Sequence, residues 1–202
     1  MKRFITLLAC VAAAALLAVL GLKFLSPDGP RVRARTSDGN GIIIEELSYY
    51  KGDEKEFGKL FRPEDGAGLP GAVFFHEPLK TKASESILRQ LAGEGVLGYQ
   101  SALHGGARDV EFIVKRFSGE KAVAPGMVFV ISDSYCSDAV VNAVLKLGHR
   151  IQGLVLIDPQ LGDKASGVVD RYGDEFLVID TARDGDIMGM IEDYLESKGA
   201  LK

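Results

Sequence analysis

Residues with the chemistry of nucleophilic catalysis follow several apolar segments of this chain. They are His76-Glu77-Pro78, His104-Gly105-Gly106, Ser132-Asp133-Ser134-Tyr135-Cys136, Asp158-Pro159 and the run from Asp180 to Asp184. A serine hydroxyl becomes a nucleophile when a histidine, oriented by a carboxylate, removes its proton. All of these residue types are present, so the fold must decide whether they meet.

The apolar segments that precede these residues have the length and composition of buried strands. They are Ala72–Phe75, Met127–Ile131, Leu154–Ile157 and Phe176–Ile179, with Val96–Leu103 as a weaker member. Unbroken apolar runs of this length are typical of parallel strands covered on both faces. Two earlier segments, Ile42–Tyr50 and Phe57–Phe61, are predicted to form a leading pair of strands.

Amphipathic stretches of helical length separate the strand segments. They are Thr81–Leu91, Ala107–Phe117, Ser137–Leu147 and Asp186–Lys198. Alternation of this kind predicts an α/β fold with a mostly parallel sheet flanked by helices. In such sheets ligands bind at the carboxyl ends of the strands, which is where the polar residues above fall.

The composition excludes several classes of function. The chain has 24 basic and 28 acidic residues, a net charge of −4, and no block of Lys or Arg, so a nucleic-acid partner is not expected. Its 2 cysteines provide neither a disulfide framework nor a metal cluster. The Gly93–Gly98 segment matches G-x-G-x-x-G but precedes a strand, and Asp180, Asp184 and Asp186 lack the later glutamate of a calcium loop. No cofactor or metal is predicted.

The N-terminal segment has the features of a membrane anchor. Lys2 and Arg3 precede an apolar run at residues 4–25, which as a helix would be about 33 Å long and would cross a bilayer core of about 30 Å. The basic residues favour a cytoplasmic N-terminus and an extracytoplasmic domain, periplasmic or extracellular. A cleaved signal peptide, or a lipoprotein modified at Cys10, is the alternative. We therefore expect an anchor at 1–25, a linker at 26–41 and a domain at 42–202.

From residue 42 to about 186 the chain resembles the α/β-hydrolase superfamily, with features of the dienelactone hydrolase branch. Tyr49-Tyr50-Lys51-Gly52-Asp53 and the later Val73–Glu77 are similar to the leading strands of that branch and to its His-Glu pair. Val128–Ser137 occupies the place of the strand, nucleophile and helix. Leu154–Pro159 follows at the family's spacing, and Leu177–Asp184 resembles the strand and loop that carry the acid.

The resemblance implies a role for each site residue. Ser134 would be the nucleophile, Asp184 the acid, and the N–H of Tyr135 one donor of the oxyanion hole. Cys136 offers a second register for the nucleophile, although a buried structural cysteine is the simpler interpretation. Glu77 would approach the nucleophile, as in the dienelactone branch, or be solvated.

Three departures from the family pattern weaken the catalytic interpretation. The glycines that flank the nucleophile are replaced by Ser132 and Cys136. The second oxyanion donor would come from about Pro78, which has no N–H. The family's histidine follows one further strand after the acid, but this chain continues into a helix and has no histidine after His149.

Two other histidines could replace the missing base. His76 and His104 both follow strands at the edge of the sheet where Ser134 lies, whereas His149 precedes its strand. Of these, His104 is the better substitute base, although a loop histidine without catalytic role is the simpler interpretation of both.

Three functions remain open at this point. The first is a catalytically degenerate domain that binds a partner protein or ligand at the membrane. The second is a minimal serine hydrolase acting on an ester through Ser134, Asp184 and a displaced base such as His104. The third is a small subunit of a larger membrane complex, which the sequence does not separate from the first. The departures favour the non-catalytic interpretation.

Overall fold

The computed structural model of this chain describes residues 31–51, 54–64, 66–172 and 175–201. All the site residues discussed below belong to one compact unit, formed by residues 32–47 and 57–201. The apolar run at residues 4–25, predicted as an anchor, lies outside the described residues. None of the helices within them has the length and apolar character that a membrane crossing requires.

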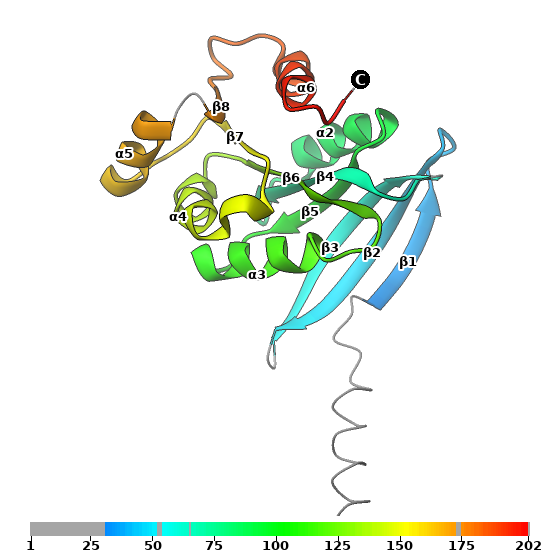
Figure 1. The fold of residues 1–202 in the computed structure, drawn as a ribbon. Helices are drawn as coiled ribbons and strands as arrows, with labels where there is room; N and C mark the ends of the chain where they lie inside the picture. Colours follow the sequence, from blue (N-terminus) through cyan, green and yellow to red (C-terminus); the bar gives the residue numbers. More distant parts are fainter. Residues whose placement is uncertain (1–30, 52–53, 65, 173–174, 202) are drawn as a thin grey trace, which may run out of the picture. The chain divides into compact units, whose positions relative to one another are not determined.

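The described strands form a single sheet of eight strands in the order β1-β2-β3-β5-β4-β6-β7-β8 (Figure 1). Their bounds are β1 (Arg31–Ser37), β2 (Ile42–Lys51), β3 (Glu54–Pro63), β4 (Leu69–His76), β5 (Leu97–Ala102), β6 (Val123–Ser132), β7 (Gly153–Ile157) and β8 (Phe176–Ile179). From β5 through β4, β6 and β7 to β8 every pair is parallel, and β3 pairs with β5 antiparallel. The prediction of a mostly parallel sheet is confirmed.

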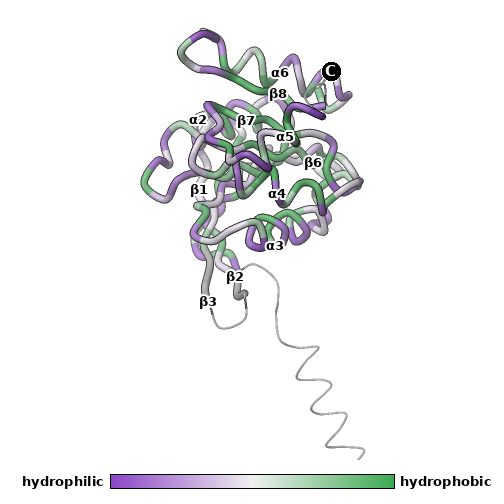
Figure 2. The backbone as a smooth tube through the Cα atoms, turned by 90° about the vertical axis from the view of Figure 1, so that its left-hand side faces the viewer, coloured by the Kyte–Doolittle hydropathy of each residue, from purple (hydrophilic) through white to green (hydrophobic). Residues whose placement is uncertain are grey.

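Helices cover both faces of the parallel part of the sheet. They are α2 (Thr81–Gly93), α3 (Ala107–Phe117), α4 (Ser137–Leu147), α5 (Asp163–Tyr172) and α6 (Ile187–Ser197), with a short 3₁₀ turn η1 (Gly148–Arg150) before β7. α3 and α4 lie on one side of the sheet, and α2 and α6 on the other (Figure 1). Along α3 hydrophilic and hydrophobic positions alternate, as its amphipathic sequence predicts (Figure 2).

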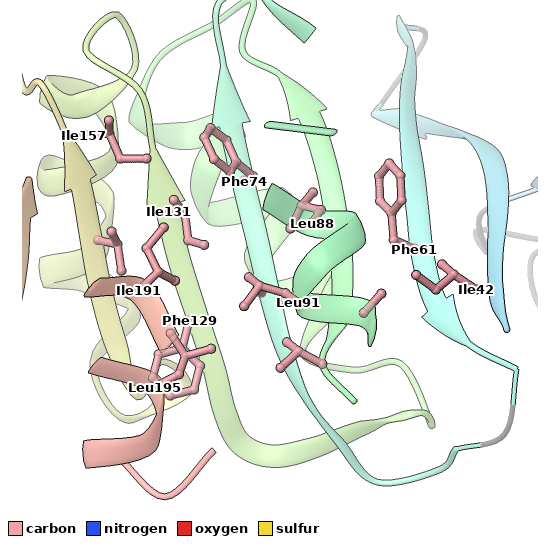
Figure 3. Packing of buried hydrophobic residues seen from close by; sticks show 14 of the residues in the cluster. Ile42, Phe61, Phe74, Leu88, Leu91, Phe129, Ile131, Ile157, Ile191 and Leu195 are labelled. Atoms are coloured by element: carbon pink, nitrogen blue, oxygen red, sulfur yellow. The ribbon is translucent and has the colours of Figure 1, made fainter. Parts of the chain in front are cut away.

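One hydrophobic core lies between the sheet and the helices α2 and α6. Leu88 and Leu91 of α2 face Phe74 of β4, while Ile191 and Leu195 of α6 lie over the neighbouring strands (Figure 3). All five side chains are at most 2% exposed. Because successive strand residues point to opposite faces, the same side of β4 that carries Phe74 also carries His76.

Two elements differ from the sequence interpretation. Arg31–Ser37, within the predicted linker, forms β1, and all seven of its residues are exposed. An edge strand without a buried face gives no apolar pattern. The helix α5 was not predicted either, because Gly167 lies within it and Ala165 is its one buried residue.

A single hydroxyl group connects α6 to the sheet. Tyr194 Oη accepts a hydrogen bond from Leu154 N at 3.2 Å and donates one to the carbonyl of Glu175 at 2.6 Å. Burial raises the pKa of Tyr194, so the phenol keeps its hydrogen and can donate at neutral pH. Without the hydroxyl, the N–H of the fully buried Leu154 would lose its acceptor.

Tyr194→Phe should therefore lower the free energy of unfolding of the full chain by about 1–3 kcal/mol. Chemical denaturation followed by circular dichroism measures this change. The control is Tyr172→Phe, because Tyr172 is 39% exposed and its hydroxyl makes no hydrogen bond within the described part of the chain. If Tyr172→Phe lowered the free energy of unfolding as much as Tyr194→Phe, the stabilising role of the Tyr194 hydroxyl would be contradicted.

Candidate active site

The pairing of β4 with β6 positions the turn that carries Ser134. Phe75 lies opposite Ser132 in this parallel register, so the ends of both strands meet at the carboxyl edge of the sheet. Asp133 N donates to the carbonyl of Phe75 at 3.1 Å, which extends the ladder by one residue. The segment after β4, beginning at His76 and Glu77, consequently lies beside the Asp133–Cys136 turn.

Asp133 uses its carboxylate to bind both sides of this junction. Its Oδ2 accepts from the backbone N–H of Glu77 at 2.8 Å, and its Oδ1 accepts from Cys136 N at 3.3 Å. Its carbonyl accepts from Cys136 N at 3.1 Å and from Ser137 Oγ at 2.8 Å. Asp133 therefore closes the turn that precedes α4, whose own N-cap residue, Cys136, provides no side-chain cap.

The backbone at Ser134 lacks the strain of a nucleophile elbow. In such an elbow the serine occupies a sharp, strained turn, and its flanking glycines prevent clashes. Of the non-glycine residues that the structure describes, Asp158 alone has a positive φ, at 47°, so Ser134 follows ordinary turn geometry. Without the close approach, Ser132 and Cys136 fit, both fully buried, and Ser132 Oγ lies 3.2 Å from Ser137 Oγ.

Ser134 itself is half-buried, and no described residue activates it. Its Oγ makes no hydrogen bond to any described residue, and its carbonyl accepts a long bond from Gln160 N at 3.4 Å. Tyr135, which would supply an oxyanion donor through its N–H, has an exposed side chain. Serine hydroxyls without a nearby base are ordinary alcohols.

Neither candidate histidine is bonded to Ser134. His76 is 3% exposed, and its Nδ1 lies 2.7 Å from the carbonyl of Glu77. His104 is exposed in the loop after β5, and β4 lies between β5 and the strand that leads to Ser134. His149 lies in η1, before β7, at the other end of the strands.

The carboxylate of the acid candidate Asp184 accepts hydrogen bonds from residues of its own loop. Its Oδ2 accepts from Asp180 N at 2.9 Å, and its Oδ1 accepts from Arg183 Nε at 3.1 Å. The guanidinium of Arg183 holds the pKa of Asp184 below its usual range. Nearby, the strained Asp158 accepts two hydrogen bonds from Thr181, at 2.8 and 2.6 Å, and joins the ends of β7 and β8.

Two further candidates have structural partners. Cys136 is fully buried, and burial together with the adjacent Asp133 raises the pKa of its thiol. Glu77 forms an ion pair with Lys80 at 2.8 Å, on the surface before α2. Within the described residues, no three His, Cys, Asp or Glu side chains converge as a metal site requires.

Asp133 is the residue that sequence reasoning missed. The sequence places it only as a neighbour of the nucleophile, because its bond to Glu77 joins residues 56 positions apart. The available signal was the tendency of an Asp between a strand and a helix to close a turn through its side chain.

Comparisons with known proteins agree with this architecture. No protein-family description matches the sequence, and no curated protein matches it. A dienelactone hydrolase-like promiscuous phosphotriesterase from metagenomic libraries aligns with a TM-score of 0.61 and 13% identity, over 80% of this chain and 99% of its own. The chain has an α/β-hydrolase-like fold.

Two further solved structures support the same fold. An acetyl xylan esterase from Paenibacillus aligns with a TM-score of 0.55 and 15% identity, over 87% of this chain and 70% of the esterase. A dienelactone hydrolase assigned in Klebsiella pneumoniae aligns with a TM-score of 0.53 and 15% identity, over 79% of this chain and 82% of its own. At identities this low, the structural similarity establishes the architecture alone, and any catalytic chemistry has to be argued from the site residues.

The burial of Cys136 gives a prediction for its reactivity. In a Cys10→Ser background, the folded full chain should react with a thiol reagent at pH 8 at least about a hundredfold more slowly than the unfolded chain, because thiolate forms rarely at a buried thiol. Absorbance of the released thiol product follows the reaction. Comparable rates before and after unfolding would show that Cys136 is accessible and ionisable.

Proposed function

We propose that this chain is a membrane-anchored, extracytoplasmic α/β-hydrolase-like protein without hydrolase activity, acting as a binding or complex-associated subunit. The observation that carries the proposal is the hydrogen bond from Glu77 N to the Asp133 carboxylate. Glu77 directly precedes Pro78, and these two residues begin the loop from which the second oxyanion donor would come.

The Asp133 carboxylate opposes oxyanion stabilisation in two ways. It accepts the Glu77 N–H, and the following residue, Pro78, has no N–H to offer. It also brings an acceptor oxygen to the junction where a tetrahedral intermediate would need donors. Removing one oxyanion donor typically lowers the rate by about a hundred- to a thousandfold.

The acid and base positions support the same conclusion. A triad needs a histidine that contacts both the nucleophile and the acid. Here Asp184 is bonded to Arg183 and to its own loop, and neither His76 nor His104 is bonded to Ser134 in the described structure. The relaxed turn at Ser134 adds a third departure.

A minimal serine hydrolase is the second candidate. The half-buried Ser134 hydroxyl favours it, because a substrate could reach Oγ without displacing a partner among the described residues. His104 would then have to move to serve as base, since apo geometry does not by itself exclude a catalytic group.

A fluorophosphonate serine probe separates these candidates. We expect the detergent-solubilised full chain to show no labelling that depends on Ser134, so that the parent chain and Ser134→Ala give equal signals in gel fluorescence. A serine esterase added to the same sample confirms that the probe is active, and a thermal unfolding transition confirms that the chain is folded. Labelling that disappears in Ser134→Ala would overturn the proposal, and His104→Ala would then identify the base.

The anchor is tested separately in bacterial membranes. The apolar run at residues 4–25 and the preceding Lys2 and Arg3 support it. The chain should remain in the membrane pellet after alkaline carbonate washing, and alkaline phosphatase fused to its C-terminus should be active. A Leu16→Arg, Leu17→Arg variant should lose both properties, since each charge costs about 3 kcal/mol at the centre of a bilayer. Release of the parent chain by carbonate would contradict the anchor.

A further inference from the structure

A cavity of about 260 Å³ lies beside the start of α2, away from Ser134. Its wall is formed by strands β1 to β5 and by the first residue of α2, and Ser134, His104 and Asp184 do not line it. At about 30 Å³ for each water-sized group, it holds a molecule of roughly ten non-hydrogen atoms. Every residue used below belongs to the compact unit formed by residues 32–47 and 57–201.

Two buried polar side chains reach this cavity, and each is 3% exposed. Gln100 Nε2 donates to Thr81 O at 2.9 Å and to Ser84 Oγ at 2.7 Å, so its amide is held in place against α2. His76 Nδ1 lies 2.7 Å from the carbonyl of Glu77. Because a carbonyl only accepts, Nδ1 carries the hydrogen, and Nε2 of the neutral ring is an acceptor.

His76 Nε2 has no hydrogen-bond partner among the residues that the structure describes. Nε2 is not one of the fully buried polar atoms, so water in the cavity can reach it, and a ligand hydroxyl or amide donor can take the place of that water. The cavity therefore presents one oriented acceptor on a rigid strand.

The cavity wall carries one guanidinium group. The Arg33 guanidinium lies 5.0 Å from the ring centroid of Phe57 and forms no ion pair with a described residue. Lys59 and Glu46 line the same wall. Lys59 pairs with Glu85 at 3.0 Å, and Glu46, like Arg33, is exposed. Arginine binds carboxylates with two parallel hydrogen bonds, and its stacking on Phe57 orients the planar group.

The start of α2 also lies at the cavity. Thr81, the first residue of the helix, lines the cavity, and the preceding Lys80 provides no side-chain cap. The exposed N–H groups and the helix dipole favour a negative group there. Phe57, Leu47 and Ala102 supply apolar wall for the body of a ligand.

We propose that this cavity binds a small hydroxylated carboxylate, whose carboxylate contacts Arg33 and whose hydroxyl donates to His76 Nε2. This site is separate from Ser134 and does not depend on the absence of hydrolase activity.

The test uses the detergent-solubilised full chain and 4-hydroxybenzoate, a probe of ten non-hydrogen atoms. Ligand-observed NMR titration should give saturable binding with a Kd of about 1 mM or tighter. Benzoate, which lacks the hydroxyl, and 4-hydroxybenzyl alcohol, which lacks the carboxylate, should each bind about tenfold more weakly. Micelles without protein provide the blank.

Two variants test whether 4-hydroxybenzoate binds in the cavity. Arg33→Gln should weaken 4-hydroxybenzoate about tenfold or more, and Ala102→Met, which fills the wall, should abolish binding. The matched control is Arg35→Gln, on the same strand, because Arg35 pairs with Glu45 at 3.6 Å and does not line the cavity. Thermal unfolding checks that each variant is folded.

The proposal fails if 4-hydroxybenzoate shows no saturable binding to the folded parent chain. It fails equally if Arg33→Gln and Arg35→Gln bind alike, or if the alcohol binds as tightly as the acid. These outcomes say nothing about labelling of Ser134, so the two proposals are tested independently.

Discussion

The parallel pairing of β4 with β6 is the constraint on which the candidate site depends. It places the end of β4, with His76 and Glu77, directly beside the turn that follows β6. Once these ends are adjacent, the Asp133 carboxylate can satisfy one N–H from each segment. The same register points His76 to the face of the sheet that α2 covers. The end of β4 therefore contributes His76 to the cavity and Glu77 to the turn at Asp133.

Backbone geometry and side-chain identity at the turn are mutually consistent. A serine held at a positive φ would need small neighbours, whereas the relaxed turn here accommodates Ser132 and Cys136 without a clash. Ser132 contacts the hydroxyl of Ser137, so β6 and the first residue of α4 are joined by side chains as well as by the chain itself. The strained backbone is found instead at Asp158, which has a positive φ and whose side chain accepts a hydrogen bond from Thr181.

The sequence predicted the sheet well and the site only in part. Phe176–Ile179, Ala107–Phe117 and Ser137–Leu147 have the predicted bounds, because apolar period and helix amphipathicity are local properties. The strand β1 was missed since none of its side chains is buried. Most predicted site residues lie after strands, and His76 is itself the last residue of β4. Their hydrogen-bond partners depend on the folded backbone: Asp184 bonds to Arg183, and Asp133 bonds to Glu77, which the pairing of β4 with β6 places beside it.

Three separate contacts hold the relaxed turn in place. To adopt a strained elbow, the chain would have to lose the Asp133 hydrogen bond to Cys136, the contact between Ser132 and Ser137, and the packing of Cys136 together. Each of these changes alone lowers stability, and none alone creates a positive φ at Ser134. A single substitution is therefore expected to destabilise the turn without converting it into a strained elbow.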